Sequence, residues 1–336
     1  MKLIIQIPCF NEETTLPVTL QQLPRHLPGI DRIEFLVIDD GSADETVQSA
    51  RRLGVDHILR FGQHRGLASA FRAGLEECLR QGADLIVNTD GDNQYSGEDV
   101  SLLVQPILAG NADLVVGSRD IQGIPHFSLV KKWLQKGGSW IVRKAAGCAI
   151  PDATSGFRAY TREAALQTIV HSKFSYTLET LIQAGSSDLR VATVPVRVNP
   201  KLRESRLAGS TWDYVKRSAA TIVRIYAMYH PLRVFSAIGL AGILAGVLLG
   251  LRYLYFYFAQ ASSGHIQSLI LSAVLMIVGF QIVVIGLVAD LIRANRRLSE
   301  ELLYRVRRME HVEGRTGPAL DTEKPIAVAS SRRSRR

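Results

Sequence analysis

Short apolar runs alternate with amphipathic stretches between Lys2 and about Val196. Four apolar runs have the length and composition of buried strands, at residues 3–7, 33–38, 84–88 and 114–117. Between two of these runs, a leucine or phenylalanine recurs every fourth residue from Leu67 to Leu79, as on the buried face of a helix. The alternation predicts an α/β domain with a mostly parallel sheet.

Ser42 is followed three residues later by Glu45, directly before a series that contains Val47, Ala50 and Leu53. This spacing is typical of a capping box, in which each of the two side chains bonds to the backbone N–H of the other residue. The pattern therefore predicts that a helix begins here.

Two later stretches, residues 232–258 and 266–289, are apolar throughout. A helix needs about 20 apolar residues to cross roughly 30 Å of hydrocarbon, so both stretches are predicted to span a membrane. The connector 259–265 has no Lys or Arg, whereas both outer flanks are basic. The positive-inside rule then predicts a multi-pass protein of the inner cell membrane, with the α/β domain and both termini in the cytoplasm.

Basic and aromatic residues are interleaved with aliphatic ones over residues 212–229, which predicts a helix lying in the membrane interface. An ordinary amphipathic packing helix would show the same pattern. In the first span, Gly242, Gly246 and Gly250 share one helix face, which suggests an interface with a second copy of the chain. Glycine is also common in membrane spans without such a role.

The chain thus divides into four predicted parts, namely an α/β domain (1–210), an interface helix (211–230), a two-helix transmembrane hairpin (231–290) and a basic tail with a disordered end (291–336). The net charge of +9 comes largely from basic residues that flank the apolar stretches. This placement suits anionic membrane lipids, and no nucleic-acid module is visible. The cysteines, Cys9, Cys78 and Cys148, have no metal-ligand spacing and are expected to be reduced core residues.

Acidic clusters follow two of the strand-like runs, in FLVIDDGSADET (35–46) and DLIVNTDGDNQYSGED (84–99). Ligands of open α/β sheets bind outside the carboxyl ends of the strands, where both clusters are expected. Asp90, Asp92 and Gln94 offer the oxygen ligands that Mg²⁺ or Mn²⁺ prefers. A simple turn would also favour Asp, Gly and Asn in this segment.

The segments IPCFNEE, DDGSADET, DGDNQ, VVGSRD (115–120) and DATSGFRAYTREA (152–164) occur in this order. Together they resemble the inverting GT-A glycosyltransferases of the family that includes dolichyl-phosphate mannose synthases and bacterial polyprenyl-phosphate glucosyltransferases. The resemblance covers about residues 3–210. It implies a GT-A fold, with a Rossmann-like and mostly parallel sheet, followed by the interface helix and the two transmembrane helices.

The resemblance also implies roles for individual residues. The nucleotide pocket is expected to contain Pro8, Phe10, Glu12, Asp39 and Asp90. The metal and the diphosphate are expected at Asp90, Asp92 and Gln94, and the catalytic groups are Asp90, Asp92 and Arg119. The acceptor phosphate is expected near Lys131, Lys136, Arg203, Ser205 and Arg206, although the last three would also fit a solvated basic linker.

Two positions depart from the family pattern. His64-Arg65-Gly66 stands where the family often has Asn-x-Gly, and Gly156 stands where some bacterial members have an Asp. The second departure removes a candidate base, which favours an acceptor that is already an anion, such as a phosphate. Asp152 and Glu179 remain as candidate bases, or as structural residues.

The resemblance therefore implies metal-dependent, inverting transfer of a sugar from a UDP- or GDP-linked donor to a polyprenyl phosphate. Transfer to a hydroxyl-bearing lipid such as diacylglycerol, or nucleotide-sugar binding without turnover, would use the same donor motifs. A processive polysaccharide synthase would normally carry more spans and a Gln-x-x-Arg-Trp segment, and neither is present.

Overall fold

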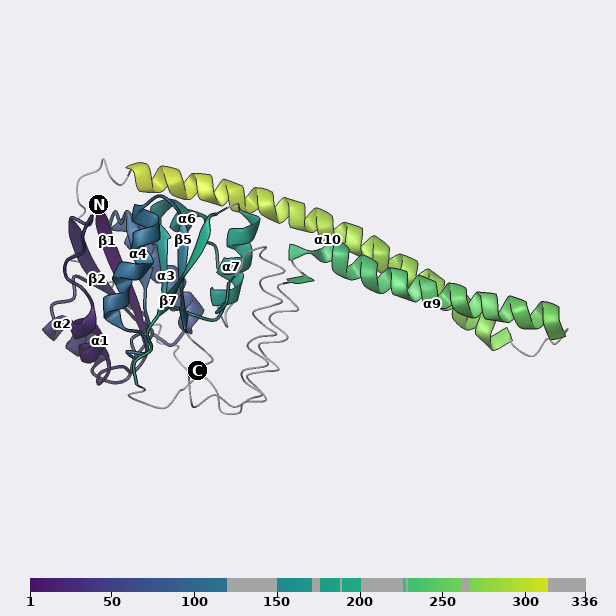
Figure 1. Ribbon diagram of the computed structural model, residues 1–336, viewed down its shortest axis with the longest axis horizontal. Coiled ribbons are helices and arrows are strands. Elements are labelled where there is room, and N and C mark those ends of the chain that lie inside the picture. Colours follow the sequence, from purple (N-terminus) through teal and green to yellow (C-terminus); the bar gives the residue numbers. More distant parts are fainter. Residues whose placement is uncertain are drawn as a thin grey trace, which may run out of the picture.

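The computed structural model describes residues 1–119, 150–170, 176–187, 189–200, 226–227, 229–260 and 266–313. A sheet with helices on both faces forms the predicted α/β domain, and two long helices project from it as a hairpin (Figure 1). The predicted interface helix falls almost entirely outside the described residues. The end of the predicted tail, from residue 314, also lies outside them.

The sheet has seven strands in the order β3-β2-β1-β4-β6-β5-β7. The strands are β1 (Lys2–Cys9), β2 (Arg32–Asp39), β3 (His57–Arg60), β4 (Leu85–Asn88), β5 (Leu114–Arg119), β6 (Arg158–Thr161) and β7 (Val191–Val196). All are parallel except β6, which lies antiparallel between β4 and β5. The α/β fold and the four predicted strands are confirmed, whereas β3, β6 and β7 were missed.

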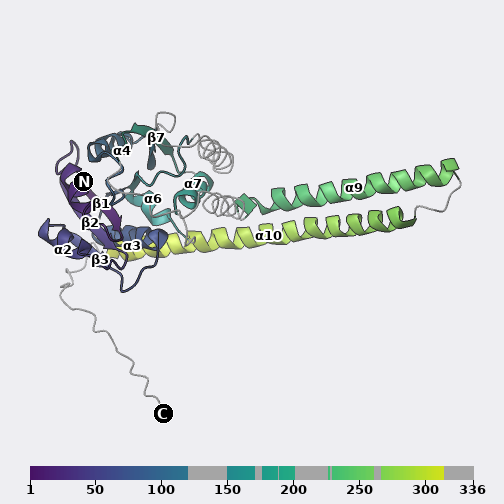
Figure 2. The ribbon, with the colours of Figure 1, turned by 90° about the horizontal axis from the view of Figure 1, so that it is seen from below.

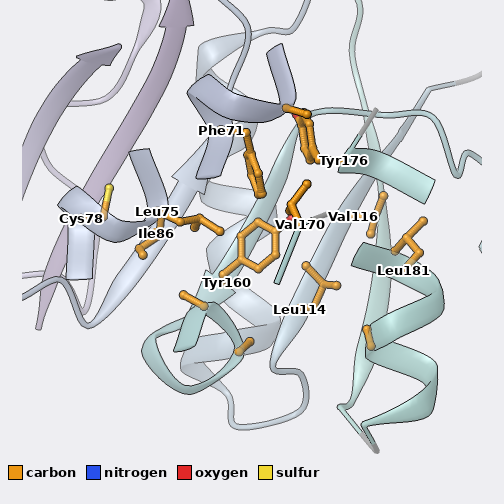
Figure 3. Close-up of a cluster of buried hydrophobic side chains, with 14 of the residues drawn as sticks. Phe71, Leu75, Cys78, Ile86, Leu114, Val116, Tyr160, Val170, Tyr176 and Leu181 are labelled. Carbon is orange, nitrogen blue, oxygen red and sulfur yellow. The ribbon is translucent and has the colours of Figure 1, made fainter. Parts of the chain in front are cut away.

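Helices cover both faces of the sheet and form two hydrophobic cores. The helices of the domain are α1 (Leu16–Gln22), α2 (Thr46–Arg52), α3 (Leu67–Arg80), α4 (Val100–Leu108), α6 (Arg162–Gln167) and α7 (Tyr176–Ser186). Alternate residues of β1 point to opposite faces, so Ile4 joins the core under α3 and α7 while Ile5 joins the core under α1 and α4. In the first core, the rings of Phe71 and Tyr176 stack with centroids 3.8 Å apart (Figure 3).

The start of α2 differs from the prediction. The helix begins at Thr46, whose backbone N–H donates to Asp44 Oδ1 (3.0 Å). The Ser42 hydroxyl instead accepts a hydrogen bond from the backbone N–H of Asn11 (2.9 Å). The predicted capping box is therefore wrong, because the loop after β1 takes the serine for a tertiary contact.

The hairpin consists of α9 (Pro231–Gln260) and α10 (Ile266–Glu313). Both helices are long and apolar enough to cross a membrane, and only 11% and 17% of their most apolar segments are buried. Neither helix is therefore the buried core helix of a soluble domain. Side chains such as Leu244 and Phe280 are instead exposed on the outside of the hairpin.

The glycine face of α9 packs against α10 of the same chain. A Cβ atom on Gly246 would lie 2.8 Å from Met276 Cγ, and one on Gly250 would lie 3.0 Å from Ser272 Oγ. The Ser272 hydroxyl also donates to the Gly246 carbonyl (2.6 Å). This face is thus used inside the hairpin, which corrects its interpretation as a free interface for a second copy.

Helix α10 does not end where the second apolar stretch ends. It continues as one helix to Glu313, and its last turns lie beside α3 of the domain (Figure 2). The first part of the predicted basic tail, residues 291–313, therefore belongs to this same helix.

Candidate active site

The carboxyl ends of β1, β2 and β4 bring the acidic motifs together at one edge of the sheet. Asp39 ends β2 in register with Cys9 of β1, and Asn88 ends β4 in register with Gln6 of β1. The loop that follows β4 carries Asp90 and Asp92. As predicted for an open α/β sheet, the candidate chemistry lies just beyond the strand ends.

Asp90 and Asp92 form the candidate metal site. Burial and the negative charge of Asp92 raise the pKa of Asp90 to about 7. The backbone N–H of Gln94 donates to Asp92 Oδ1 (3.1 Å), so the loop folds back on its own carboxylate. Crowded carboxylates of this kind are relieved by a cation.

The described residues hold no group of three or more His, Cys, Asp or Glu side chains that could bind a metal. Two carboxylates nevertheless fit Mg²⁺, which is usually held by one or two carboxylates together with substrate phosphates and water. The residues present therefore suit a divalent ion that is shared with a diphosphate.

Gly156 packs directly against Asp90. A Cβ atom at Gly156 would lie 3.2 Å from both carboxylate oxygens of Asp90 and 2.9 Å from the Tyr176 hydroxyl. An Asp at this position would also add a further negative charge beside Asp90, in addition to that of Asp92. In this chain a larger or acidic residue at position 156 would thus crowd Asp90.

Arg119 and Asp152 form a buried ion pair next to this loop. Arg119 Nε lies 2.6 Å from Asp152 Oδ2, and its Nη2 also donates to Thr154 (3.0 Å). Burial acts to raise the pKa of Asp152, but the hydrogen bonds and charge of Arg119 prevail and lower it. Asp152 is therefore a paired carboxylate, which supports its structural role over a role as a base.

Glu179, the other candidate base, is 1% exposed on α7. Its carboxylate lies 3.9 Å from Nη2 of Arg296, on α10. Glu179 thus faces the long helix of the hairpin as well as the domain interior.

On the nucleotide side, Asp39 is fully buried and its Oδ2 accepts no hydrogen bond within the described part of the chain. Arg60 Nε lies 3.2 Å from this oxygen, but without the geometry of a hydrogen bond. A buried acceptor of this kind is costly unless a ligand donor reaches it. Asp39 therefore suits an N–H or O–H group of a bound nucleoside.

The loop after β3 takes its position from Asp40. The two carboxylate oxygens of Asp40 accept from the backbone N–H groups of Arg65 (2.7 Å) and Gly66 (2.8 Å), at the start of α3. His64 lies 2.9 Å from Asp40, and its ring lies 4.1 Å from the Phe10 ring. The loop of His64-Arg65-Gly66 is thus held by the Asp40 carboxylate and by the ring pair of His64 and Phe10, close to the predicted nucleotide pocket.

Two further residues of the predicted pocket lie close by. Pro8 is in β1, beside Ile38 of β2. Glu12 is buried, and its backbone N–H donates to Thr46 Oγ1 (2.8 Å). The structure therefore brings Pro8, Phe10, Glu12 and Asp39 to the same edge.

Several buried polar residues that support this edge were missed by the sequence analysis. Arg158 is fully buried, and it donates to Thr180 Oγ1 (2.6 Å) and to the carbonyls of Ser155 (2.8 Å) and Thr177 (2.9 Å). Asn88 donates to the Gly156 carbonyl (2.8 Å). A charged residue inside the apolar run FRAY was the available signal for Arg158, because buried charges need satisfied partners.

The predicted acceptor residues, Lys131, Lys136, Arg203, Ser205 and Arg206, lie outside the described residues. The chain that leads into the last three does reach the loop that carries Asp90 and Asp92. The backbone N–H of Asn199 donates to the Gln94 carbonyl (2.9 Å), and the Asn199 side chain donates to the Asn93 carbonyl (3.1 Å).

The mostly parallel seven-stranded sheet, with its one inserted antiparallel strand, is that of the GT-A class of glycosyltransferases. Residues 4–168 match the family described as glycosyl transferase family 2. The chain belongs to this family and is a glycosyltransferase, as the resemblance implied.

Two curated relatives and one solved structure illustrate the match. The chain is 30% identical to the undecaprenyl-phosphate mannosyltransferase of Micrococcus luteus, over 62% of this chain and 88% of the relative. It is 28% identical to the undecaprenyl-phosphate 4-deoxy-4-formamido-L-arabinose transferase of Pseudomonas paraeruginosa, over 85% and 83%. Glucosyl-3-phosphoglycerate synthase of Mycobacterium tuberculosis, solved with Mn²⁺ and UDP, shares the fold, with a TM-score of 0.53, 20% identity and coverage of 68% and 79%.

Proposed function

We propose that this glycosyltransferase moves a sugar from a nucleotide diphosphate onto a polyprenyl phosphate at the cytoplasmic face of the membrane. The proposal rests on one observation, which is that the same chain contains a GT-A domain with a candidate active site and an apolar helical hairpin. Both curated relatives are named as undecaprenyl-phosphate sugar transferases, and one of them matches over 85% of this chain, a share that includes part of the hairpin.

The donor is proposed to bind across the carboxyl edge of the sheet. Asp39 offers its buried oxygen to the nucleoside, and Phe10 lies at the same end of the site. The diphosphate would then lie toward Asp90 and Asp92. The two relatives are named for different sugars, mannose and an aminoarabinose derivative, so the family name leaves the donor sugar open.

Asp90 and Asp92, with Gln94, are proposed to hold Mg²⁺ or Mn²⁺ in this chain. A metal bound there supplies positive charge that stabilises the departing nucleoside diphosphate. Arg119 lies near enough to Asp90 to affect its pKa, and Asp152 holds its guanidinium in place. Arg119 thus adds a second, fixed positive charge on the leaving-group side.

The acceptor phosphate is proposed to attack the anomeric carbon directly, with inversion at that carbon. A phosphate is already an anion near neutral pH and needs no strong base. The pairing of Asp152 with Arg119 and the contact between Glu179 and Arg296 support this mechanism, because both candidate bases are engaged elsewhere. Asn199 is hydrogen-bonded to Gln94 in the loop that carries Asp90 and Asp92, and it is followed closely in the chain by Arg203, Ser205 and Arg206.

The orientation is proposed from charge and geometry together. The domain and the last turns of α10 lie at the same end of the hairpin, away from its connector (Figure 1). The basic residues near that end, such as Arg293 and Arg296, favour the cytoplasmic side.

The proposal is tested with the detergent-purified full chain, Mn²⁺ or Mg²⁺, and a panel of radiolabelled nucleotide sugars with undecaprenyl or dolichyl phosphate. We expect label in the organic phase with the phosphorylated lipid, and none after addition of EDTA. Transfer to diacylglycerol but not to the phosphorylated lipid would overturn the assigned acceptor. Transfer that persists in EDTA would overturn the metal site.

A further inference from the structure

Helix α10 joins the membrane hairpin to the catalytic domain without a break. Residues 287–313 contain no glycine or proline, so the helix has no site at which it would bend easily. Residues 296–311 lie beyond the second apolar stretch, and at about 1.5 Å per residue they form about 22 Å of helix. We call residues 296–311 of α10 the strut.

The membrane end of the strut contacts α7. Arg296 lies 3.9 Å from the buried carboxylate of Glu179, and its Cζ lies 5.2 Å from the centre of the Tyr229 ring. Arg296 is itself held by Glu300, one turn further along α10 (2.7 Å). The same α7 carries Tyr176, whose hydroxyl accepts from Asn88 at the active-site edge (3.0 Å).

The far end of the strut contacts α3 and α6. Arg307 and His311 both reach Glu76 of α3, at 3.1 and 3.0 Å. The Tyr304 hydroxyl donates to Glu163 of α6. The strut therefore touches three separate helices of the domain.

Helices α6 and α10 each provide an arginine that binds near the C-terminus of the other helix. Arg307 of the strut donates to the carbonyl of Thr168 (3.2 Å), just beyond the C-terminus of α6. Arg162, at the start of α6, donates to the carbonyl of His311, near the C-terminus of α10 (3.2 Å). Cations at helix C-termini interact favourably with the helix dipole, so each helix stabilises the other.

We infer that the strut is a positioning element that holds the active site at a fixed height and angle relative to the bilayer, where the acceptor phosphate lies. The inference rests on the proposed lipid acceptor. A single ion pair would let the domain swivel, whereas contacts to three helices over about 22 Å do not. Fixed placement matters because a misplacement of about 1 Å can lower a rate about 100-fold.

The test compares two full-length double variants that carry the same changes of residue type. The undocking variant is Glu76→Lys with Arg296→Gln, which repels Arg307 and His311 and removes a contact to α7. The control variant is Glu77→Lys with Arg305→Gln. Glu77 pairs with Arg80 inside α3, and Arg305 pairs with Glu301 inside α10, so neither ion pair joins the strut to the domain.

Each variant is reconstituted in bilayers and assayed with two acceptors, a long-chain polyprenyl phosphate in the bilayer and a short, water-soluble prenyl phosphate. We expect the undocking variant to lose about 10-fold or more in kcat/KM for the bilayer acceptor. Its kcat/KM for the soluble acceptor and its KM for the nucleotide sugar should stay within about twofold, because the donor site is not displaced. The control should match the wild type with both acceptors.

An equal loss with both acceptors would overturn the inference, because the strut would then support the fold of the active site. No loss with the bilayer acceptor would overturn it as well. Hydrogen exchange of residues 291–313 supplies a readout that needs no acceptor, and we expect faster exchange in the undocking variant only. If the wild type transfers to no phosphorylated lipid, the proposed function fails, while the exchange data still decide whether the strut is docked.

Discussion

The catalytic domain and the hairpin treat the same kinds of side chain in opposite ways. Leu36 and Phe71 of the domain are fully buried, whereas Leu248 and Phe280 of the hairpin are 59% and 63% exposed. Charged groups show the reverse, because Arg158, Asp152 and Glu179 lie inside the domain with polar partners, whereas the exposed side chains of the two apolar spans are mostly apolar.

This difference shows that the two regions are built for different solvents. The domain is stable in water because its sheet is covered on both faces. The hairpin satisfies its backbone hydrogen bonds within its helices, as a segment in hydrocarbon must, and offers apolar side chains to lipid. α10 belongs to both regions, since one helix runs from the lipid-facing segment to the ion pairs on the domain.

The largest expected effect tests whether sugar transfer depends on the residues at the carboxyl ends of the strands. Asp92→Asn removes a charge from the proposed metal site, and we expect about 1,000-fold lower transfer, as for other losses of transition-state charge stabilisation. The assay is labelled sugar in the organic phase at saturating metal. Asp113→Asn, at the opposite edge of the sheet, is the control and should retain activity within about twofold. Unchanged transfer by Asp92→Asn would refute the metal assignment.

The next effect concerns the charges buried in the domain. Asp152→Asn leaves the Arg119 guanidinium without its carboxylate, so we expect the free energy of unfolding at pH 7 to fall by about 3–5 kcal/mol. Because the folded-state pKa of Asp152 is lowered, its contribution is fully present above its unfolded pKa of about 4 and is lost as pH falls through the lower folded value.

Chemical denaturation of the solubilised chain over a pH series measures this contribution. The difference between wild type and Asp152→Asn should be constant above about pH 5 and shrink below about pH 4. A difference that stays the same through the acid range would show that the ion pair is not its cause.

A matched pair of leucines tests the comparison itself. Leu36→Ala opens a cavity in the sheet and should destabilise the domain by about 2–5 kcal/mol. Leu248→Ala, on the outer face of α9, should change stability by no more than about 0.5 kcal/mol, since lipid can fill the space. Thermal unfolding of both variants in the same detergent is the measurement. Equal losses would mean that the hairpin face is packed against protein.

The smallest expected effect tests the close contact at Gly156. Gly156→Ala places a methyl group 3.2 Å from the Asp90 oxygens, and we expect about 10-fold weaker Mn²⁺ binding with the fold retained. Gly62→Ala is the control, because a Cβ atom there has no neighbour within 4 Å. Titration calorimetry with Mn²⁺ in the presence of nucleoside diphosphate measures the change, and tight binding by Gly156→Ala would show that Asp90 is not a ligand.

Much of the fold could be predicted because local patterns carry it. The strands β1, β2, β4 and β5 are mostly apolar and buried along most of their length, as in sheets that are covered on both faces. β3 and β7 were missed because they lie at the edges of the sheet and alternate weakly, with largely half-buried side chains. β6 was missed because it is short and begins with an arginine, and only the fold shows that Arg158 is satisfied, in part by Thr180 of α7.

The sequence by itself determined the α/β domain, the two apolar spans and the acidic loop at Asp90 and Asp92, because burial period, span length and motif spacing are local properties. Only the tertiary structure decided which groups meet. It paired Arg119 with Asp152, placed the glycine face of α9 against α10, and docked the strut of α10 on Glu76 and Glu179. A local pattern tells which side of an element is buried, but the partner on that side depends on segments far away in the chain.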